Sequence, residues 1–385
     1  MSLSVSGRRR QHEPTGPLPR LLRVLLRRCR EPTLPWDQAL HQGRAVHVGR
    51  EVTSATESRL STGRREVSRL WGVPGLRLWE LNGTAAMPGG GHQAEGEDMS
   101  SLMLQDGRTL TFDDVGDSAG YPVVWHHGSM TCRMLRHPDD SRAAAAGLRI
   151  VAVDRPGHGG SSPQKGRTLH GWADDVEQLA DHLGLDRFAV AGASAGGPNA
   201  LAVARWLGDR VSHGVLASSL GPLDDPGALA DLDRMMALPF RFLRVPWLIR
   251  LPLASTARLA RTNPAKWVDQ WQRSSSPADR DVFADPAFRA MLEHQTPEAW
   301  RLGLQGLIDD LTAIHAWGFP PDDITQHIDV FHGDGDTTVS LAMGTRLAAR
   351  LPNSDLHVIP DQGHLLFLAS WDSIIEALAS RVSTT

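Results

Sequence analysis

Short apolar runs alternate with stretches of helical periodicity from Met99 to the end of the chain. Most of these runs are continuously apolar, as in strands that are buried on both faces of a sheet. Strands are predicted over residues 101–104, 109–113, 122–126, 148–153, 188–191, 211–218, 328–332 and 356–359. Helices are predicted over residues 172–183, 198–207, 341–351 and 371–381. This alternation is typical of an α/β fold, in which helices cover both faces of a mostly parallel sheet.

The alternation stops between Ser219 and Asp323, where the chain has helical segments but no convincing strand. Within this interval the periodicity predicts helices over residues 229–238, 264–273 and 297–311. An insertion of this length between two strands usually has a function. We therefore expect a helical cap over residues 222–322, above the edge of the sheet where parallel strands end and α/β folds bind their ligands.

Residues 1–98 have a different composition from the rest of the chain. They are rich in Arg, Gly, Ser and Pro, show no sustained period of 2 or 3.6, and end in a glycine-rich stretch at Pro88–Gly91. We expect a disordered extension here, followed by the core in two parts, residues 99–221 and 323–385.

Two alternatives for residues 1–98 stay open. Pro19–Cys29 has the pattern of a short basic amphipathic helix. The second alternative is that the natural start of the protein is Met87 or Met99, so that the upstream residues are not normally made.

Composition narrows the classes of function and location. The formal net charge is −4, which argues against a nucleic-acid partner. The two cysteines, Cys29 and Cys132, form no ligand or redox spacing, which fits a reducing compartment, so we expect a cytoplasmic protein. No apolar run reaches the ~20 residues that span a membrane, and Leu21–Leu26 is broken by Arg23 and lacks a signal-peptide cleavage site. The sequence therefore predicts no integral membrane segment.

The segment Gly192–Gly196 carries the pattern Gly-x-Ser-x-Gly between a predicted strand and a predicted helix. A turn this tight requires small neighbours, which explains Gly192 and Gly196. The hydroxyl of Ser194 is then raised above the sheet, at a helix N-terminus whose dipole favours negative charge. The context predicts Ser194 as a nucleophile.

A serine hydroxyl needs a base, and the base needs an acid that fixes its tautomer. In this architecture the usual chain order is serine, acid, histidine. His364 is the last histidine and follows the last predicted strand, so it is predicted as the base. Asp336 and Asp334 both follow the strand that ends at His332; Asp336 is favoured because it lies further around the turn, and Asp334 is the alternative.

Attack on a carbonyl builds an oxyanion, which backbone N–H groups stabilise. One predicted donor is Ala195, directly after the nucleophile, and the other is Ser129, in the loop after the strand that ends at His126. The adjacent pair His126 and His127 is not predicted to bind a metal, because no third ligand accompanies it and neighbouring strand residues face opposite sides.

Asp154–Ser161 follows another predicted strand and contains three glycines, like a phosphate-binding turn. No lysine follows at the spacing of a P-loop, and no helix begins promptly. We interpret the segment as a structural turn beside the active site.

Residues 99–385 resemble the α/β-hydrolase superfamily along essentially their whole length. Within it they are similar to capped hydrolases related to haloperoxidases and proline iminopeptidases. The matching segments, in the family's order, are His127–Ser129, Asp154–Ser161, Gly192–Pro198, Gly333–Asp336 and Gly363–His364. The resemblance implies an α/β-hydrolase fold with a mostly parallel eight-stranded sheet and a helical cap insertion. It also implies Asp336 as the acid, three residues after Gly333, and Ser129 as the oxyanion donor after the His-Gly pair.

The resemblance implies a serine hydrolase, esterase-like, that cleaves a carboxylic ester or amide through an acyl-enzyme and needs no cofactor. A haloperoxidase, perhydrolase or acyltransferase would use the same three residues, and a ligand-binding protein with a silent site is a further alternative. The cap carries Met235, Met236, Phe240 and Trp247, which predict an apolar pocket for a small lipophilic substrate; the alternative is that they form the ordinary core of the cap.

Overall fold

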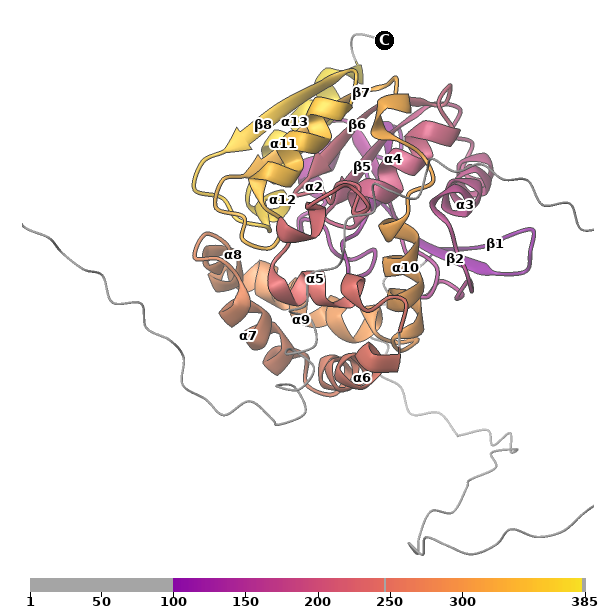
Figure 1. Ribbon diagram of the computed structural model, residues 1–385. Helices are drawn as coiled ribbons and strands as arrows, with labels where there is room; N and C mark the ends of the chain where they lie inside the picture. Colours follow the sequence, from indigo (N-terminus) through magenta and orange to yellow (C-terminus); the bar gives the residue numbers. More distant parts are fainter. Residues whose placement is uncertain (1–99, 246, 383–385) are drawn as a thin grey trace, which may run out of the picture. The chain divides into compact units, whose positions relative to one another are not determined.

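An eight-stranded sheet forms the centre of the computed structural model, which describes residues 100–245 and 247–382 (Figure 1). Its strands are β1 (Ser100–Met103), β2 (Thr109–Gly116), β3 (Tyr121–His126), β4 (Leu148–Val153), β5 (Phe188–Ala193), β6 (Val211–Ala217), β7 (His327–Gly333) and β8 (Ser354–Ile359). They lie in the order β1-β2-β4-β3-β5-β6-β7-β8. The pairs β1–β2 and β2–β4 are antiparallel, and every other pair is parallel. The predicted mostly parallel sheet of eight strands is confirmed.

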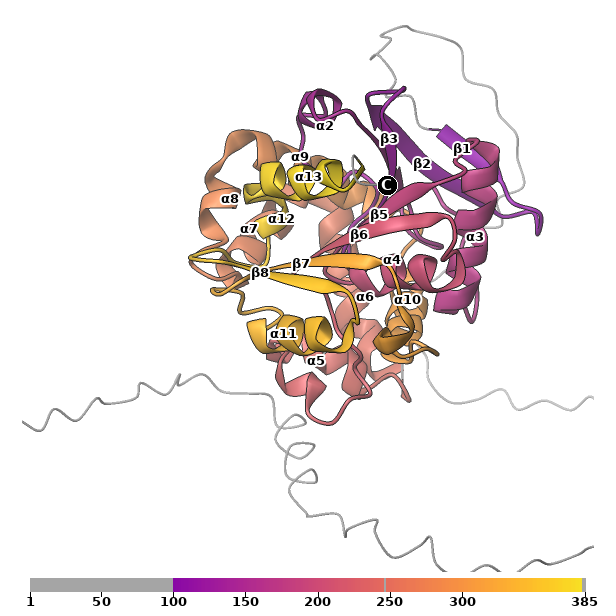
Figure 2. The ribbon, with the colours of Figure 1, turned by 90° about the horizontal axis from the view of Figure 1, so that it is seen from above.

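Helices cover both faces of the sheet (Figure 2). One face carries α3 (Leu169–His182), α4 (Gly196–Trp206) and α11 (Leu341–Arg350), and the other carries α2 (Ser141–Ala145), α12 (Leu366–Ala369) and α13 (Trp371–Ser380). Each face has its own apolar cluster because successive side chains of a strand point to opposite sides. Val124 therefore belongs to one cluster, and its neighbours Val123 and Trp125 belong to the other.

The chain between β6 and β7 is helical, and we refer to it as the cap. It comprises α5 (Arg234–Arg241), α6 (Trp247–Thr262), α7 (Pro264–Ser274), α8 (Arg280–Ala284), α9 (Pro286–Ala299) and α10 (Gln305–His315), with 3₁₀ turns η1 (Ala228–Ala230) and η2 (Pro321–Asp323). Figure 1 shows α5 to α9 gathered at one end of the sheet. None of the helices in the described part of the chain is long and apolar enough to cross a membrane. The predicted extension over residues 1–98 lies outside the described residues.

Two helices of the cap differ from the predicted ranges. The helix predicted over residues 297–311 is two helices, because α9 ends at Ala299 and Gly303 adopts a φ of 85°, a left-handed conformation that ends helices. The helix predicted over residues 229–238 begins later: the side chain of Asp233 accepts a hydrogen bond from the N–H of Met235 and caps α5.

Candidate active site

The turn between β5 and α4 holds Ser194 in a left-handed conformation with a φ of 54°. This conformation costs a residue with a side chain about 1–3 kcal/mol and persists only where the surroundings enforce it. A Cβ atom on Gly192 would overlap the backbone of Gly196, and a Cβ atom on Gly196 would overlap the carbonyl oxygen of His126. The two glycines therefore allow the sharp reversal that raises Ser194 above the carboxyl edge of the sheet.

Two further side chains reach Ser194 from neighbouring strand ends. Asp336 follows β7 and His364 follows β8. Nε2 of His364 lies 3.0 Å from Oγ of Ser194, and Nδ1 of His364 lies 2.9 Å from Oδ2 of Asp336. Ser194, Asp336 and His364 are only 5%, 6% and 8% exposed. The structure thus brings together the three side chains that the sequence singled out.

The charges of Asp336 and His364 each shift the pKa of the other residue. Oδ1 of Asp336 accepts hydrogen bonds from the backbone N–H groups of Thr338 and Val339, at 2.8 and 2.9 Å. Burial raises the pKa of Asp336, but the charge of His364 and hydrogen bonds from His332 and His364 outweigh it, so the pKa lies well below its usual range. Burial lowers the pKa of His364, but the charge and hydrogen bond of Asp336 raise it above its usual value. Ionised Asp336 therefore favours the protonated form of the His364 ring.

Asp334, the alternative acid of the sequence analysis, bonds to the backbone of a neighbouring loop and not to His364. It is exposed, and its Oδ1 accepts a hydrogen bond of 2.8 Å from the backbone N–H of Asp361. This bond joins the loop after β7 to the loop after β8. Of the two aspartates, only Asp336 faces His364.

The loop after β3 runs beside Ser194. A Cβ atom added to Gly128 would lie 3.5 Å from Cβ of Ser194, so the backbone of Gly128 lies next to the Ser194 side chain. Ala195 is fully buried at the beginning of α4. The two residues predicted to supply oxyanion donors thus belong to the β3 loop and the β5–α4 turn, two segments that meet at Ser194, and their role stays a prediction.

A buried ion pair links this loop to the cap, and sequence reasoning missed it. Both oxygens of Asp310, in α10, accept hydrogen bonds from Arg155 at 3.0 Å, and the two side chains are fully buried. The same guanidinium donates to the carbonyl oxygens of His127 and Gly128, the latter at 2.9 Å. The segment Asp154–Ser161 is therefore an ionic junction between the cap and the loop that carries Ser129.

A second arginine connects Asp310, through Asn199, to the residue that follows Ser194. Arg167 donates to Asp310 and, at 2.7 Å, to Oδ1 of Asn199. Nδ2 of Asn199 donates in turn to the carbonyl oxygen of Ala195 at 2.8 Å. No local sequence pattern indicates these contacts, since Arg167 and Asp310 are 143 positions apart.

A family model described as the α/β hydrolase fold matches residues 121–370, which include Ser194, Asp336 and His364. The chain belongs to this family. This α/β hydrolase is similar to the pimeloyl-[acyl-carrier protein] methyl ester esterase of Aromatoleum aromaticum, with 31% identity over 232 residues, 58% of this chain and 83% of the relative. It is also similar to a non-heme chloroperoxidase of Streptomyces lividans, with 33% identity over 136 residues, 32% of this chain and 46% of the relative.

A solved structure shares the fold of this α/β hydrolase. The thermophilic esterase of Thermogutta terrifontis superimposes with a TM-score of 0.54 and 21% identity, over 74% of this chain and 98% of that chain. At this identity the likeness shows the fold alone. The resemblance predicted from the motifs is confirmed by the family match. Together with a relative that is named an esterase, this match shows that the chain is an esterase-like α/β hydrolase.

The four predicted pocket residues lie in different environments. Phe240 is 4% exposed, and Met236 is half-buried against the same apolar cluster. Met235 and Trp247 are 73% and 67% exposed. Met236 and Phe240 thus pack as the ordinary core of the cap would, and contact of any of the four residues with a substrate stays a prediction.

His126 and His127 lie inside the core of the α/β hydrolase. Nδ1 of His126 lies 3.0 Å from the carbonyl oxygen of Ala191, and burial lowers the pKa of His126 to about 3. Nε2 of His127 accepts a hydrogen bond of 3.2 Å from the backbone N–H of Arg155. Both rings therefore act as neutral hydrogen-bonding groups.

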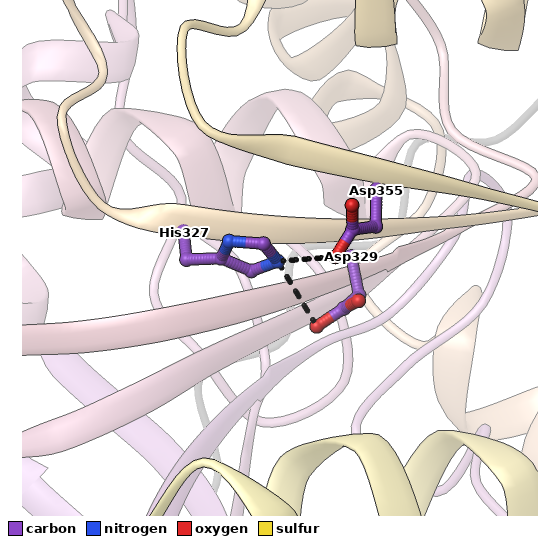
Figure 3. Close-up of side chains that lie close together, drawn as sticks. All are labelled: His327, Asp329 and Asp355. Atoms are coloured by element: carbon purple, nitrogen blue, oxygen red, sulfur yellow. Dashed lines mark ion pairs between the residues drawn. The ribbon is translucent and has the colours of Figure 1, made fainter. Parts of the chain in front are cut away.

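Near the start of β7, His327 and Asp329 lie close to Asp355 of β8 (Figure 3). Nε2 of His327 lies 3.3 Å from the carboxylate of Asp355 and 3.7 Å from that of Asp329. Such a trio has the residue types of a metal site. Arg381 nevertheless pairs with both carboxylates, at 2.7 and 3.2 Å, and His357 lies 2.7 Å from Asp329. Because a guanidinium already compensates the carboxylates, we interpret the group as an ion-pair cluster that fastens the end of α13 to the sheet.

Proposed function

We propose that this α/β hydrolase is a serine hydrolase that cleaves a carboxylic ester or amide of a small lipophilic substrate through an acyl-enzyme. One observation carries the proposal: the ring of His364 lies between Ser194 and Asp336, within hydrogen-bond distance of both. A free serine hydroxyl is a weak nucleophile, and an imidazole held in this position removes its proton as it attacks. The carboxylate fixes the tautomer and stabilises the imidazolium that forms.

The proposed reaction has two steps of the same kind. Nε2 of His364 accepts the proton while Oγ of Ser194 bonds to the carbonyl carbon, whose π electrons move to the oxygen. The N–H groups of Ser129 and Ala195 hold this oxyanion, each contributing about 3 kcal/mol to the transition state. The intermediate collapses, and the leaving group departs with the proton of His364. Water then attacks the acyl-enzyme with the same base and releases the acid.

An ester is the favoured substrate class. The relative from Aromatoleum aromaticum is named a methyl ester esterase. A lipophilic acyl or alcohol group would contact the apolar residues predicted in the cap, of which Met236 is half-buried and Phe240 is buried. If the same acyl-enzyme transferred its acyl group to an acceptor other than water, the protein would be a perhydrolase, haloperoxidase or acyltransferase. The relative named a non-heme chloroperoxidase favours keeping this second candidate.

Covalent labelling tests the proposal directly. A fluorophosphonate probe should phosphonylate Oγ of Ser194 with loss of fluoride, and Ser194→Ala should abolish both labelling and hydrolysis of p-nitrophenyl esters of varied acyl length. Circular dichroism shows whether the variant keeps the fold. A non-catalytic binding protein would not label, and turnover retained by Ser194→Ala would also overturn the proposal. Comparing water, hydrogen peroxide and alcohols as acceptors separates the hydrolase from the second candidate.

A further inference from the structure

The α5–α6 part of the cap is unusually cationic. Between Arg234 and Val268 the chain has six arginines, one lysine and no acidic residue. The same interval also gathers exposed apolar side chains: among the residues that the structure describes, it holds six of the nine exposed large ones. Exposed apolar surface combined with one sign of charge marks an interaction site.

The two kinds of side chain share one face of α6. This face, which we call the outer stripe, consists of exposed residues at spacings of four and three: Trp247, Leu251, Ala254, Arg258 and Arg261. Trp247 and Leu251 are 67% and 82% exposed. The opposite face of α6 is packed against the rest of the cap through Ile249, Ala257 and Ala260. The helix is therefore anchored on its inner side and carries an apolar end and a cationic end outward.

Much of the positive charge of this surface is not compensated by an ion pair within the described residues. Arg241, Arg244, Arg258 and Arg261 are exposed and form no ion pair with any residue in the described ranges. Exposed cations without acidic neighbours create a positive potential that attracts anions. A partner for this face is thus expected to be anionic.

The positive charge of the outer stripe argues against two partners that this chain could provide, its own residues 1–98 and a second copy of the chain. Residues 1–98 contain 15 arginines against 10 acidic residues, so their net charge is also positive. A two-fold symmetric contact with a second copy would place the cationic face against itself. The partner expected for this face is therefore an anionic molecule other than this chain. Protruding Trp and Leu side chains suit a fluid lipid interface, which accepts them without a shape-matched pocket.

We propose that the outer stripe of α6 docks on an anionic lipid–water interface. Trp247 and Leu251 insert between headgroups, and Arg258 and Arg261 lie against the lipid phosphates. Docking would bring the cap to the place where lipophilic molecules partition. The proposal goes beyond the hydrolase activity and does not depend on it.

Vesicle sedimentation with the full chain tests this surface. The wild type should sediment with vesicles of phosphatidylcholine mixed with phosphatidylglycerol, less so as salt rises, and far less with phosphatidylcholine alone. Trp247→Ser/Leu251→Ser and Arg258→Gln/Arg261→Gln should each weaken this binding by about tenfold or more. Met103→Ser is the matched control, because Met103 is 67% exposed on β1, and it should bind as the wild type does.

Three outcomes would overturn the proposal. The first is that the wild type fails to bind the anionic vesicles. The second is that both double variants bind as well as the wild type, which would assign binding to other residues. The third is that the wild type binds soluble polyglutamate but not vesicles, which would assign the face to an acidic protein. The thermal unfolding midpoint of each variant verifies the fold, and the single variants Leu251→Ser and Arg258→Gln serve if a double variant is unstable.

Discussion

The carboxylate of Asp279, in the cap, accepts a hydrogen bond of 2.6 Å from the backbone N–H of Leu365, the residue that follows His364. Asp279 is 1% exposed, and its other oxygen accepts a hydrogen bond from Ser276 at 2.8 Å. A Cβ atom on Gly363 would overlap this carboxylate. The cap therefore holds the loop of the proposed base and places a carboxylate close to His364.

Replacing Asp279 by Asn should change the pH profile of the enzyme. Burial lowers the pKa of His364 and the Asp336 carboxylate raises it, with a smaller increase from the charge of Asp279. Asp279→Asn keeps an acceptor for Leu365 but removes that charge, so the pKa of His364 should fall. The acidic limb of kcat/KM against pH should then move to lower pH, and kcat at the optimum should fall by up to about tenfold.

Ser276→Ala is the matched control for Asp279→Asn. It removes the hydrogen bond between Ser276 and the same carboxylate but retains the charge. The acidic limb should therefore stay in place. An unmoved limb in Asp279→Asn, or equal movement in both variants, would contradict an electrostatic role; proton NMR of the His364 ring measures the same pKa without turnover.

The two aspartates after β7 should differ sharply in their effect on activity. Asp336→Asn removes the ionised partner of His364, and an amide stabilises the wrong tautomer of the ring. We expect kcat/KM for an aryl ester to fall about ten-thousand-fold. Asp334→Asn alters an exposed side chain whose one hydrogen bond within the described residues is to the backbone N–H of Asp361, so activity should stay within a few-fold of the wild type. Equal losses in the two variants would refute the assignment of the acid.

The buried ion cluster between the cap and the core should contribute strongly to the stability of the protein. Asp310→Asn leaves the guanidinium groups of Arg155 and Arg167 buried without a carboxylate, which should lower the free energy of unfolding by about 3–5 kcal/mol. Asp309→Asn, on the same helix, affects a half-buried carboxylate bonded to Gln305 and should cost less than about 1 kcal/mol. Urea unfolding measures both, and similar losses would show that the cluster contributes little.

Stability should decline on mild acidification because of buried histidines. Burial, aided by Arg155 and Arg167, lowers the pKa of His158 to about 4, although Asp310 opposes the shift. Between about pH 6.5 and pH 4 the unfolded chain binds a proton at His158 that the folded chain does not, so stability should fall by up to about 3 kcal/mol.

A His158→Gln variant isolates this contribution. Its free energy of unfolding should fall less steeply than that of the wild type between about pH 7 and pH 4.5. His170→Gln, at an exposed position on α3, should keep the slope of the wild type. An identical slope in His158→Gln and the wild type would show that His158 is not buried in its neutral form.

Local patterns were sufficient for most of the core. The strands predicted at residues 148–153 and 188–191 became β4 and β5 because an apolar run buried on both faces has a signal within a few residues. The turn around Ser194 is local for the same reason, since Gly192 and Gly196 act on each other across four positions. Cap helices were less predictable: α6 was missed, and Gly303 divided one predicted helix into two.

The amino-acid sequence by itself determined the α/β fold and the residue types at the strand ends, because both follow from periodicity and short-range steric limits. Only the tertiary structure decided that Trp247 faces outward, that Asp336 and not Asp334 faces His364, and that Asp279 and Asp310 tie the cap to the site. These choices depend on contacts such as that between Arg155 and Asp310, 155 positions apart, whose partners are selected by packing and not by any pattern along the chain.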